Sequence, residues 1–128
     1  MSGMQIHCDT HVFVWLHAGE LEQLSDLARS RIEECELVMS PIAELELTYL
    51  CEIGRTTAPG SAVFADLAER IGVVRSATSF AAVVAAAAPL SWTRDPFDRL
   101  IVGDADASAC DLLTRDSRLL DRYSRAVW

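Results

Sequence analysis

Gln5-Ile6-His7-Cys8-Asp9-Thr10 is a short, apolar-leaning stretch that predicts a strand ending at a carboxylate. Leu112-Leu113-Thr114-Arg115-Asp116, near the other end of the chain, follows the same plan of apolar residues and then an acid. Between the two, predicted strands and helices alternate, which is typical of a parallel sheet covered by helices on both faces. Side chains just past the carboxyl ends of such strands converge on one crevice. The two stretches therefore predict an α/β fold that brings Asp9 and Asp116 together.

Two proline-containing sequences mark the starts of predicted helices. Ser40-Pro41 and Asp95-Pro96 each place a capping side chain before a proline at the first helical position. The predicted strands cover residues 4–8, 37–39, 73–74, 111–114 and 125–128; the predicted helices cover 11–17, 25–35, 41–54, 61–71, 79–88 and 95–109, with a helical turn at 117–121. We expect a single domain over residues 1–128, with a central, mostly parallel sheet of four to five strands flanked by helices on both faces.

The bulk composition is that of a globular protein. Its 128 residues, 51% of them hydrophobic, suffice for one domain with a real core. The longest apolar run, Phe80 to Leu90, is too short for a membrane span and contains Pro89. The N-terminus lacks the features of a secretory signal, so we expect a cytoplasmic protein without membrane association. The four cysteines form no Cys-x-x-Cys pair, which favours free thiols over a zinc ribbon.

The net charge of −8 is unusual for a nucleic-acid binder, which normally carries a basic face. Carboxylates that together bind a cation would account for part of this acidity. All eleven basic residues are Arg, and six of them lie after position 93: Arg94, Arg99, Arg115, Arg118, Arg122 and Arg125. Arg suits bidentate contacts to phosphate. Base-composition bias in the genome is nevertheless the larger explanation for a chain that is rich in Ala and contains no Lys.

Four acids form the candidate site: Asp9, Glu46, Asp98 and Asp116. Each alone has a structural explanation, because carboxylates cap helices and stabilise their first turns. Placed together at one edge of a sheet, they would repel each other unless a cation lay between them. Ligands that are all oxygen indicate a hard divalent ion, Mg²⁺ or Mn²⁺. Asp95, directly before Pro96, is instead predicted to be an N-cap.

Other kinds of site find little support in the sequence. There is no glycine-rich nucleotide loop and no Gly-x-Ser-x-Gly elbow. The three histidines, His7, His11 and His17, lack metal-ligand spacing, and His7 and His11 flank a strand end and should point in different directions. The three tryptophans, Trp15, Trp92 and Trp128, are predicted to be packing residues rather than base-stacking platforms. The absence of Lys argues against a receiver domain or haloacid-type phosphatase.

Four blocks of the chain resemble the PIN domain family. They are Asp9 to Leu16, Ser40 to Leu47, Asp95 to Val102, and Leu113 to Asp116, and the third is the most specific. The resemblance runs essentially from end to end, and the size and motifs are similar to those of VapC-like toxins of bacterial toxin–antitoxin pairs. The chain departs from the family pattern at Leu45, because relatives often have an aromatic or small residue directly before the acid that corresponds to Glu46.

The resemblance implies a metal-dependent endoribonuclease that leaves a 5′-phosphate and a 3′-hydroxyl. It implies a homodimer held inactive by an antitoxin protein, with no direct DNA binding. By position, the four acids would be catalytic residues and ligands of Mg²⁺ or Mn²⁺, supported by Thr10 and Thr114. Arg99 and Arg115 are weaker candidates for contacts to substrate phosphate, with a local ion pair as the equal alternative.

Two questions stay open at this point. Glu44 and Glu46 are two residues apart and cannot share one helix face, so only one should reach the site, and the register favours Glu46. An apolar surface around Val12, Trp15, Leu45 and Tyr49 is a candidate for receiving a partner helix, with core packing as the alternative. The alternative functions are a non-catalytic PIN-like interaction module and another Mg²⁺-dependent phosphoester hydrolase.

Overall fold

A computed structural model describes residues 4–128. The strands are β1 (Gln5–Cys8), β2 (Glu36–Met39), β3 (Val74–Arg75), β4 (Asp111–Leu113) and β5 (Ala126–Val127). The helices are α1 (Thr10–Ala18), α2 (Asp26–Glu34), α3 (Pro41–Glu52), α4 (Gly60–Ile71), α5 (Phe80–Ala87), α6 (Pro96–Ala107) and α7 (Ser117–Arg122), with the 3-10 helix η1 (Leu21–Gln23) after α1.

The five strands form one sheet in the order β3-β2-β1-β4-β5, and every neighbouring pair is parallel. The central strand β1 pairs with β2 on one side and with β4 on the other, so His7 lies opposite both Val38 and Leu112. Both edge strands have two residues, which limits the unpaired backbone at each edge. The predicted α/β fold with a parallel sheet is confirmed.

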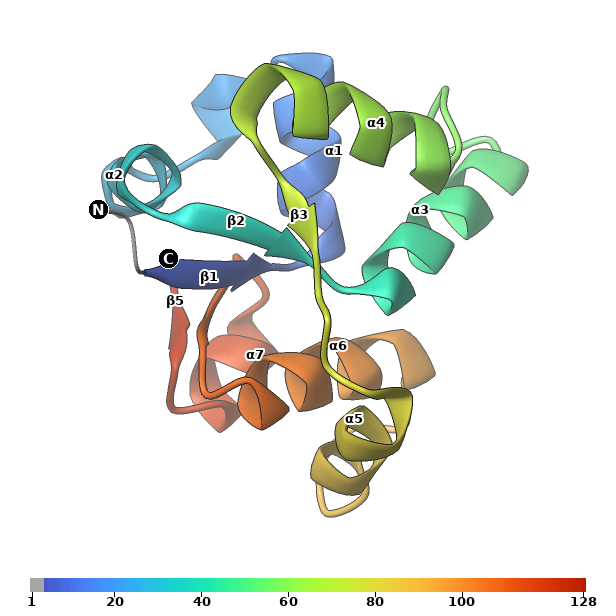
Figure 1. Ribbon diagram of the computed structural model, residues 1–128, viewed down its shortest axis with the longest axis vertical. Helices are drawn as coiled ribbons and strands as arrows, with labels where there is room; N and C mark the ends of the chain where they lie inside the picture. The colour runs from blue at the N-terminus through green and yellow to red at the C-terminus, as the bar shows by residue number, and fades with distance from the viewer. Residues whose placement is uncertain (1–3) are drawn as a thin grey trace.

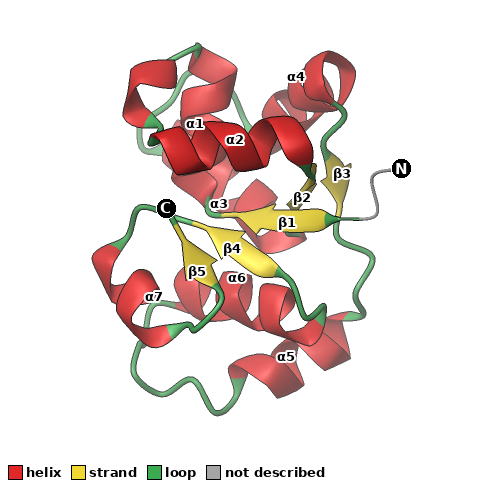
Figure 2. Cartoon of the chain, turned by 90° about the vertical axis from the view of Figure 1, so that its left-hand side faces the viewer, coloured by secondary structure: helices red, strands yellow, loops and turns green. Residues whose placement is uncertain are grey.

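Helices cover both faces of the sheet. Figures 1 and 2 show α1, α2 and α4 on one side and α6 and α7 on the other, with α5 on the outside of α6. The three-residue strand β4 is buried at Leu112 and Leu113, as expected for a strand covered from both sides. Core side chains from the helices include the fully buried Phe13, Leu47 and Ile101. The carboxyl ends of β1 and β4 therefore emerge between two helical layers.

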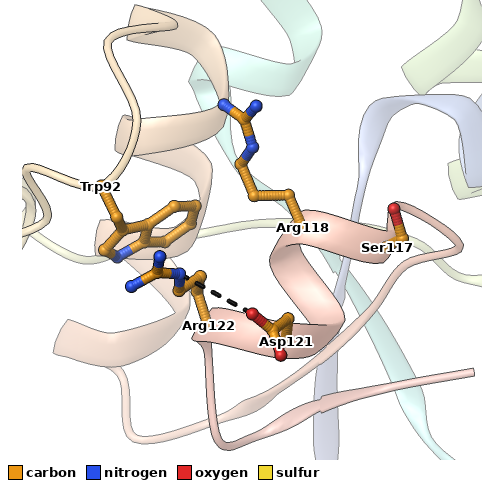
Figure 3. A pocket seen from close by; sticks show the side chains of 5 residues that line it. All are labelled: Trp92, Ser117, Arg118, Asp121 and Arg122. Carbon is orange, nitrogen blue, oxygen red and sulfur yellow. Dashed lines mark ion pairs between the residues drawn. The ribbon is translucent and has the colours of Figure 1, made fainter.

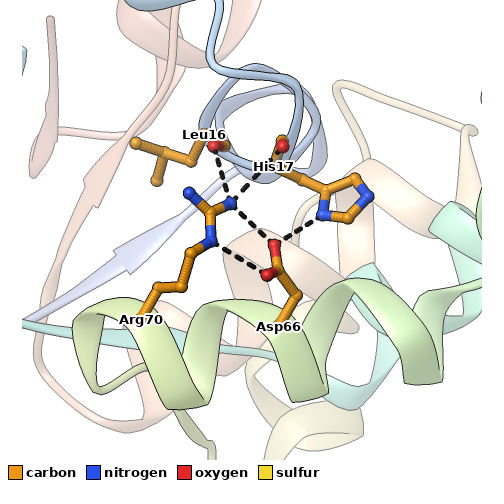
Figure 4. Close-up of polar contacts among 4 residues, drawn as sticks. All are labelled: Leu16, His17, Asp66 and Arg70. Carbon is orange, nitrogen blue, oxygen red and sulfur yellow. Dashed lines mark hydrogen bonds and ion pairs between the residues drawn. The ribbon is translucent and has the colours of Figure 1, made fainter.

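A polar cluster anchors the C-terminal end of α1 to α4 (Figure 4). Arg70 donates to both carboxylate oxygens of Asp66, at 2.9 and 2.6 Å, and to the backbone carbonyls of Leu16 and His17. His17 Nδ1 lies 2.7 Å from Asp66 Oδ2. The hydrogen bonds from Arg70 and His17 lower the pKa of Asp66 to about 2. These contacts hold the C-terminal end of α1, and Asp9 caps its N-terminal end.

Two helix contacts are so close that they require glycine. A Cβ on Gly60, at the start of α4, would lie 1.9 Å from the backbone oxygen of Glu44 in α3. A Cβ on Gly103 in α6 would lie 2.8 Å from Cβ of Ala87 in α5. Real Cβ atoms do not approach other atoms so closely, and a packed interior relaxes only partly. These glycines therefore set the spacing of α3 against α4 and of α5 against α6.

The structure refines several details of the prediction. The four cysteines are free, as predicted. The predicted strand at 73–74 lies one residue later, because Val38 and Met39 pair with Val74 and Arg75. The 3-10 helix η1 was not predicted. Within residues 4–128, no helix is both long and apolar enough to cross a membrane.

Candidate active site

Two of the four acids follow adjacent strands and begin the next helices. Asp9 follows β1 and caps α1, since its Oδ1 accepts a 2.8 Å hydrogen bond from the Thr10 N–H. Asp116 follows β4 and caps α7 by accepting from the N–H groups of Arg118 and Leu119, at 2.8 and 3.1 Å. Because β1 and β4 pair in parallel, both carboxylates lie at the same edge of the sheet.

Thr114 links these two acids directly. Its hydroxyl donates to Asp9 Oδ2 at 2.8 Å and accepts from the Asp116 N–H at 3.1 Å. The side chain is buried, with 0% of the residue exposed. Asp9 thus receives a hydrogen bond on each oxygen, from the backbone of Thr10 and from Thr114. This pair of bonds fixes the orientation of the carboxylate.

Thr10 connects the strand end to α3. Its hydroxyl donates a 2.5 Å hydrogen bond to Oε1 of Glu46, across 36 residues of sequence. The helix that carries Glu46 begins at Ser40, whose side chain accepts from the Ile42 N–H at 3.2 Å. The neighbouring acid Glu44 faces elsewhere and pairs with Arg75 through two hydrogen bonds of 2.8 and 3.0 Å. Glu46 is therefore the acid of α3 that lies at the site.

The fourth acid, Asp98, lies in the first turn of α6. Asp95 caps this helix and accepts from the N–H groups of Phe97 and Asp98, at 2.9 and 3.3 Å. The Asp98 carboxylate itself makes no hydrogen bond or ion pair with any residue from 4 to 128. Its acceptor oxygens are therefore available to a ligand.

The electrostatics show that these acids lie close together. Burial raises the pKa of Asp98 to about 7, and the charges of Asp9, Asp95, Glu46 and Asp116 add to the increase. Four carboxylates thus act on Asp98. Three of them come from other segments, and the fourth is Asp95, which caps the helix that carries Asp98. The charges of nearby acids thus add to the effect of burial on the Asp98 carboxyl.

The pKa values of Asp9 and Glu46 are raised as well. Burial raises the pKa of Asp9, and the hydrogen bonds from Thr114 and Thr10 oppose that increase. Burial also raises the pKa of Glu46, against the hydrogen bond from Thr10. Such shifts occur where carboxylates gather without a compensating positive charge, and they are characteristic of functional sites.

A pocket of about 220 Å³ opens between the first and last acidic segments. It is lined by Asp9, His11, Val12, Trp15, Arg115 and Asp116. The guanidinium carbon of Arg115 lies 5.4 Å from the centre of the Trp15 ring, and its Nη1 donates to Gln23 Oε1 at 2.6 Å. Arg115 therefore places a positive charge in the same pocket as two of the acids.

His11 is a pocket residue that the sequence analysis did not assign to the site. It lies in the first turn of α1, and its ring centre is 6.1 Å from that of Trp15. Its nearness tends to lower the pKa of Asp9 and Glu46. His7, four residues earlier, lies in the core with an Nδ1 that has no partner among residues 4–128. The position of His11 just after the strand-ending acid was the available signal.

The donor set suits a hard divalent cation. Every acid offers oxygen, the ligand atom that Mg²⁺ and Mn²⁺ prefer. The pKa values of Asp9, Glu46 and Asp98 are raised, so a nearby positive charge would stabilise their charged forms. Among residues 4–128, no three His, Cys, Asp or Glu side chains are already grouped closely enough to hold a metal ion. The fit of the acids to a divalent cation therefore rests on their donor atoms and their place at one edge of the sheet.

Arg99 lies away from the acids. Its Nε and Nη2 donate to the carbonyls of Ala87 and Ala88, at 3.0 and 2.7 Å. These carbonyls end α5, where a positive charge is stabilising. The local partner of Arg99 is thus a helix end rather than an acid.

Only part of the apolar surface predicted to receive a partner helix is exposed. Val12 is buried in the core and Trp15 is half-buried against it. Leu45, Tyr49 and Ile53 are 58%, 45% and 49% exposed. Leu45 and Tyr49 are four residues apart and lie on one side of α3, and Ile53 is the residue that caps its C-terminal end. An apolar stripe on α3 thus remains available to a partner.

Comparisons with known proteins agree with this architecture. The model of the PIN domain family matches residues 6–126. The chain is 38% identical over 123 residues to Ribonuclease VapC22 of Mycobacterium tuberculosis, with 93% of each protein covered.

Two solved structures have the same fold at low sequence identity. One is VapBC2 from Rickettsia felis bound to a DNA fragment from its promoter, with a TM-score of 0.68, 15% identity and 98% of both chains covered. The other is DNA-bound VapBC from Salmonella typhimurium, with a TM-score of 0.64, 21% identity, and 96% of this chain and 95% of that chain covered. A family match over nearly the whole sequence, together with the shared fold, shows that this chain belongs to the PIN domain family.

Proposed function

We propose that this protein is a metal-dependent endoribonuclease and the toxin of a toxin–antitoxin pair, acting on RNA in the cytoplasm. The observation that carries the proposal is the set of hydrogen bonds that brings three acids together: Thr114 joins Asp9 to the start of the Asp116 segment, and Thr10 joins the same strand end to Glu46. The raised pKa of Asp98, due first to burial and then to the neighbouring acids, agrees with this geometry. The similarity to Ribonuclease VapC22 supports RNA as the substrate. The resemblance in sequence to VapC-like toxins supports the wider role.

Asp9, Asp98 and Asp116 would hold Mg²⁺ or Mn²⁺, and Glu46 would hold a second ion or orient the attacking water. A bound divalent ion acidifies water and offsets the charge of phosphoryl oxygens. The protein contributes the geometry: Thr114 and the Thr10 N–H fix Asp9, and the Thr10 hydroxyl fixes Oε1 of Glu46. Glu46 Oε2 is then the oxygen that accepts a hydrogen bond from water. The products would carry a 5′-phosphate and a 3′-hydroxyl.

Arg115 is the better of the two arginine candidates for binding a substrate phosphate. It lines the pocket that contains Asp9 and Asp116. A guanidinium there can bind a phosphate oxygen through charge-assisted hydrogen bonds and help to overcome the repulsion between RNA and the acids. Arg99 is occupied by the carbonyls at the end of α5 and would support the position of α6 instead.

We propose two protein contacts as well. The exposed stripe of Leu45, Tyr49 and Ile53 on α3 would receive an apolar helix of the antitoxin. A homodimer, which the family resemblance implies, would be the second contact. Light scattering on the chain alone tests for the homodimer.

The test of the enzymatic proposal is cleavage of RNA by the purified protein with Mg²⁺ or Mn²⁺ and with chelator. We expect cleavage that needs the metal and is lost in Asp98→Asn, which keeps the shape of the side chain and removes its charge. Glu44→Gln is the matched control, because Glu44 pairs with Arg75 outside the site. Equal cleavage by the parent protein and Asp98→Asn would overturn the proposal.

A further inference from the structure

A second pocket lies between α7 and the loop that precedes α6. It has a volume of about 630 Å³ and is lined by Trp92, Ser117, Arg118, Asp121 and Arg122. Figure 3 shows the Trp92 indole facing α7, with the side chains of Arg118 and Arg122 extending from the helix. An aromatic ring and two guanidiniums thus share one open pocket in a chain whose net charge is −8.

The two arginines are available to bind an anion. They are four residues apart and so lie on one side of α7. The Arg118 guanidinium has no hydrogen bond or ion pair with any of the described residues 4–128. Arg122 has one ion pair among these residues, a 3.7 Å contact to Asp121 in which the side chains are 57% and 80% exposed. Such exposed pairs contribute little stability and are readily exchanged for a better partner.

Trp92 is held in place by the loop that carries it. The indole is half-buried against the core, so the prediction of a packing residue is met for part of the ring. The next residue, Thr93, is buried, and its hydroxyl accepts from the Asp95 N–H at 3.2 Å. On the other side, the Leu90 N–H donates to the Ala87 carbonyl at 3.0 Å. The backbone on both sides of Trp92 is therefore held by hydrogen bonds, and part of the ring faces the pocket.

The pocket borders the candidate active site at the start of α7. Ser117 lines it and directly follows Asp116, which lines the acidic pocket together with Asp9. The start of α7 therefore separates two neighbouring depressions. The first carries two carboxylates and Arg115, and the second carries two guanidiniums and Asp121. An RNA strand bound at the acidic pocket would be able to continue over the start of α7 into the second pocket.

We propose that this second pocket binds the single-stranded RNA next to the cleaved bond, with a base stacked on Trp92 and phosphates on Arg118 and Arg122. This inference rests on the proposed ribonuclease function. Stacking on an aromatic ring tolerates any base, and arginines contact the backbone without reading sequence. The pocket would thus add affinity that the acidic site cannot supply, because the carboxylates repel phosphate.

The experiment compares Trp92→Leu, Arg118→Gln and Arg122→Gln with Arg55→Gln, which removes the same charge from an exposed site near the end of α3. Binding of a fluorescent single-stranded RNA of about ten nucleotides is measured with Ca²⁺ at several salt concentrations. We expect Trp92→Leu to weaken binding about tenfold or more, and each pocket arginine variant to lower the salt slope by about one. Arg55→Gln should bind as the parent does.

Cleavage of two substrates separates this inference from the ribonuclease proposal. The pocket variants should raise KM for the long RNA while cleaving a dinucleotide at the parent rate. If all three bind and cleave the long RNA as the parent does, the pocket serves another ligand, such as an acidic protein segment, and the inference is wrong. If the parent cleaves no RNA, the enzymatic proposal fails, whereas the binding measurement still decides the role of the pocket. The arginine variants are exposed, so they remain informative even if Trp92→Leu is unstable.

Discussion

The Thr114 hydroxyl donates a 2.8 Å hydrogen bond to Asp9 Oδ2, across 105 residues of sequence. The same hydroxyl accepts from the Asp116 N–H, so one buried oxygen connects the ends of two parallel strands with two acids. The acid that follows β1 is therefore oriented by the residue that follows β4. Loss of this hydroxyl should affect both folding and ligand binding.

Thr114→Val should lower the free energy of unfolding by about 1–3 kcal/mol, because it leaves a buried carboxylate oxygen and an N–H without their partner. It should also weaken metal binding by about 10–100-fold, as expected when a group that orients a ligand is removed. Urea unfolding and metal titration measure the two effects. Thr114→Ser keeps the hydroxyl and should retain metal affinity; an equal loss in both variants would argue against the orienting role.

Asp98 makes the stability of the metal-free protein depend on pH. Its pKa is about 7 in the folded protein, above the ordinary value of 3.8 for an Asp carboxyl. The folded state therefore binds this proton more tightly, and the stabilisation is complete below about pH 3.8 and is lost as pH rises through about 7. We expect unfolding in chelator to require roughly 1–3 kcal/mol less free energy at pH 8 than at pH 5. Asp98→Asn should remove most of that difference.

Divalent cations should stabilise the parent protein at neutral pH. An ion that binds only the folded state raises stability by mass action, by on the order of 1–2 kcal/mol at ten to thirty times its Kd. For a domain of this size, we expect Tm to rise by about 3–8 °C between chelator and millimolar Mg²⁺ or Mn²⁺. Asp98→Asn should lose the shift and Glu44→Gln should keep it. A Tm that does not respond to either metal would contradict the site.

Arg115 and Arg99 should differ in the effect of their loss. Arg115→Gln removes a positive charge from the acidic pocket and should lower kcat/KM for RNA about tenfold, with only a small change in Tm because its contacts to Gln23 and Trp15 are exposed. Arg99→Gln removes the hydrogen bonds to Ala87 and Ala88 and should lower stability by about 1–2 kcal/mol. Kinetics at a temperature where both variants are folded would show the contrast. The reverse pattern would place Arg99 at the substrate.

Gly60→Ala tests the contact between α3 and α4. The added Cβ would lie 1.9 Å from the Glu44 backbone oxygen, so the two helices must move apart. We expect a loss of about 1–3 kcal/mol in the free energy of unfolding. Ser61→Ala, at the next and exposed position, is the control and should change stability by less than about 0.5 kcal/mol. Similar stability of the two variants would show that α4 can shift freely.

Features set by local chemistry were predictable from the sequence. Ser40-Pro41 and Asp95-Pro96 begin α3 and α6 as expected, because capping and the fixed φ of proline act within a few residues. The parallel sheet followed from the alternation of strands and helices. Helical spacing also predicted that Glu44 and Glu46 lie on different faces of α3. In the structure, Glu46 accepts from Thr10 and Glu44 accepts from Arg75.

Features set by packing between distant segments were not predictable. Nothing near Arg99 in the sequence shows that the end of α5 accepts its guanidinium. His11 and Trp15 are four residues apart on α1, so their contact is local, but their place in one pocket with Arg115 and Asp116 depends on how α1 packs beside the segment after β4. The two pockets on either side of the start of α7 depend on where the loop before α6 places Trp92. These arrangements arise only when the helical layers close on the sheet.

The four acids are spread over residues 9 to 116 and lie together only because β1 pairs with β4 and the helices close on the sheet. No short stretch of the chain carries the site by itself. A single proteolytic cut in a loop between Asp9 and Asp116 would therefore divide the group, so one accessible loop is enough for a protease to silence the protein.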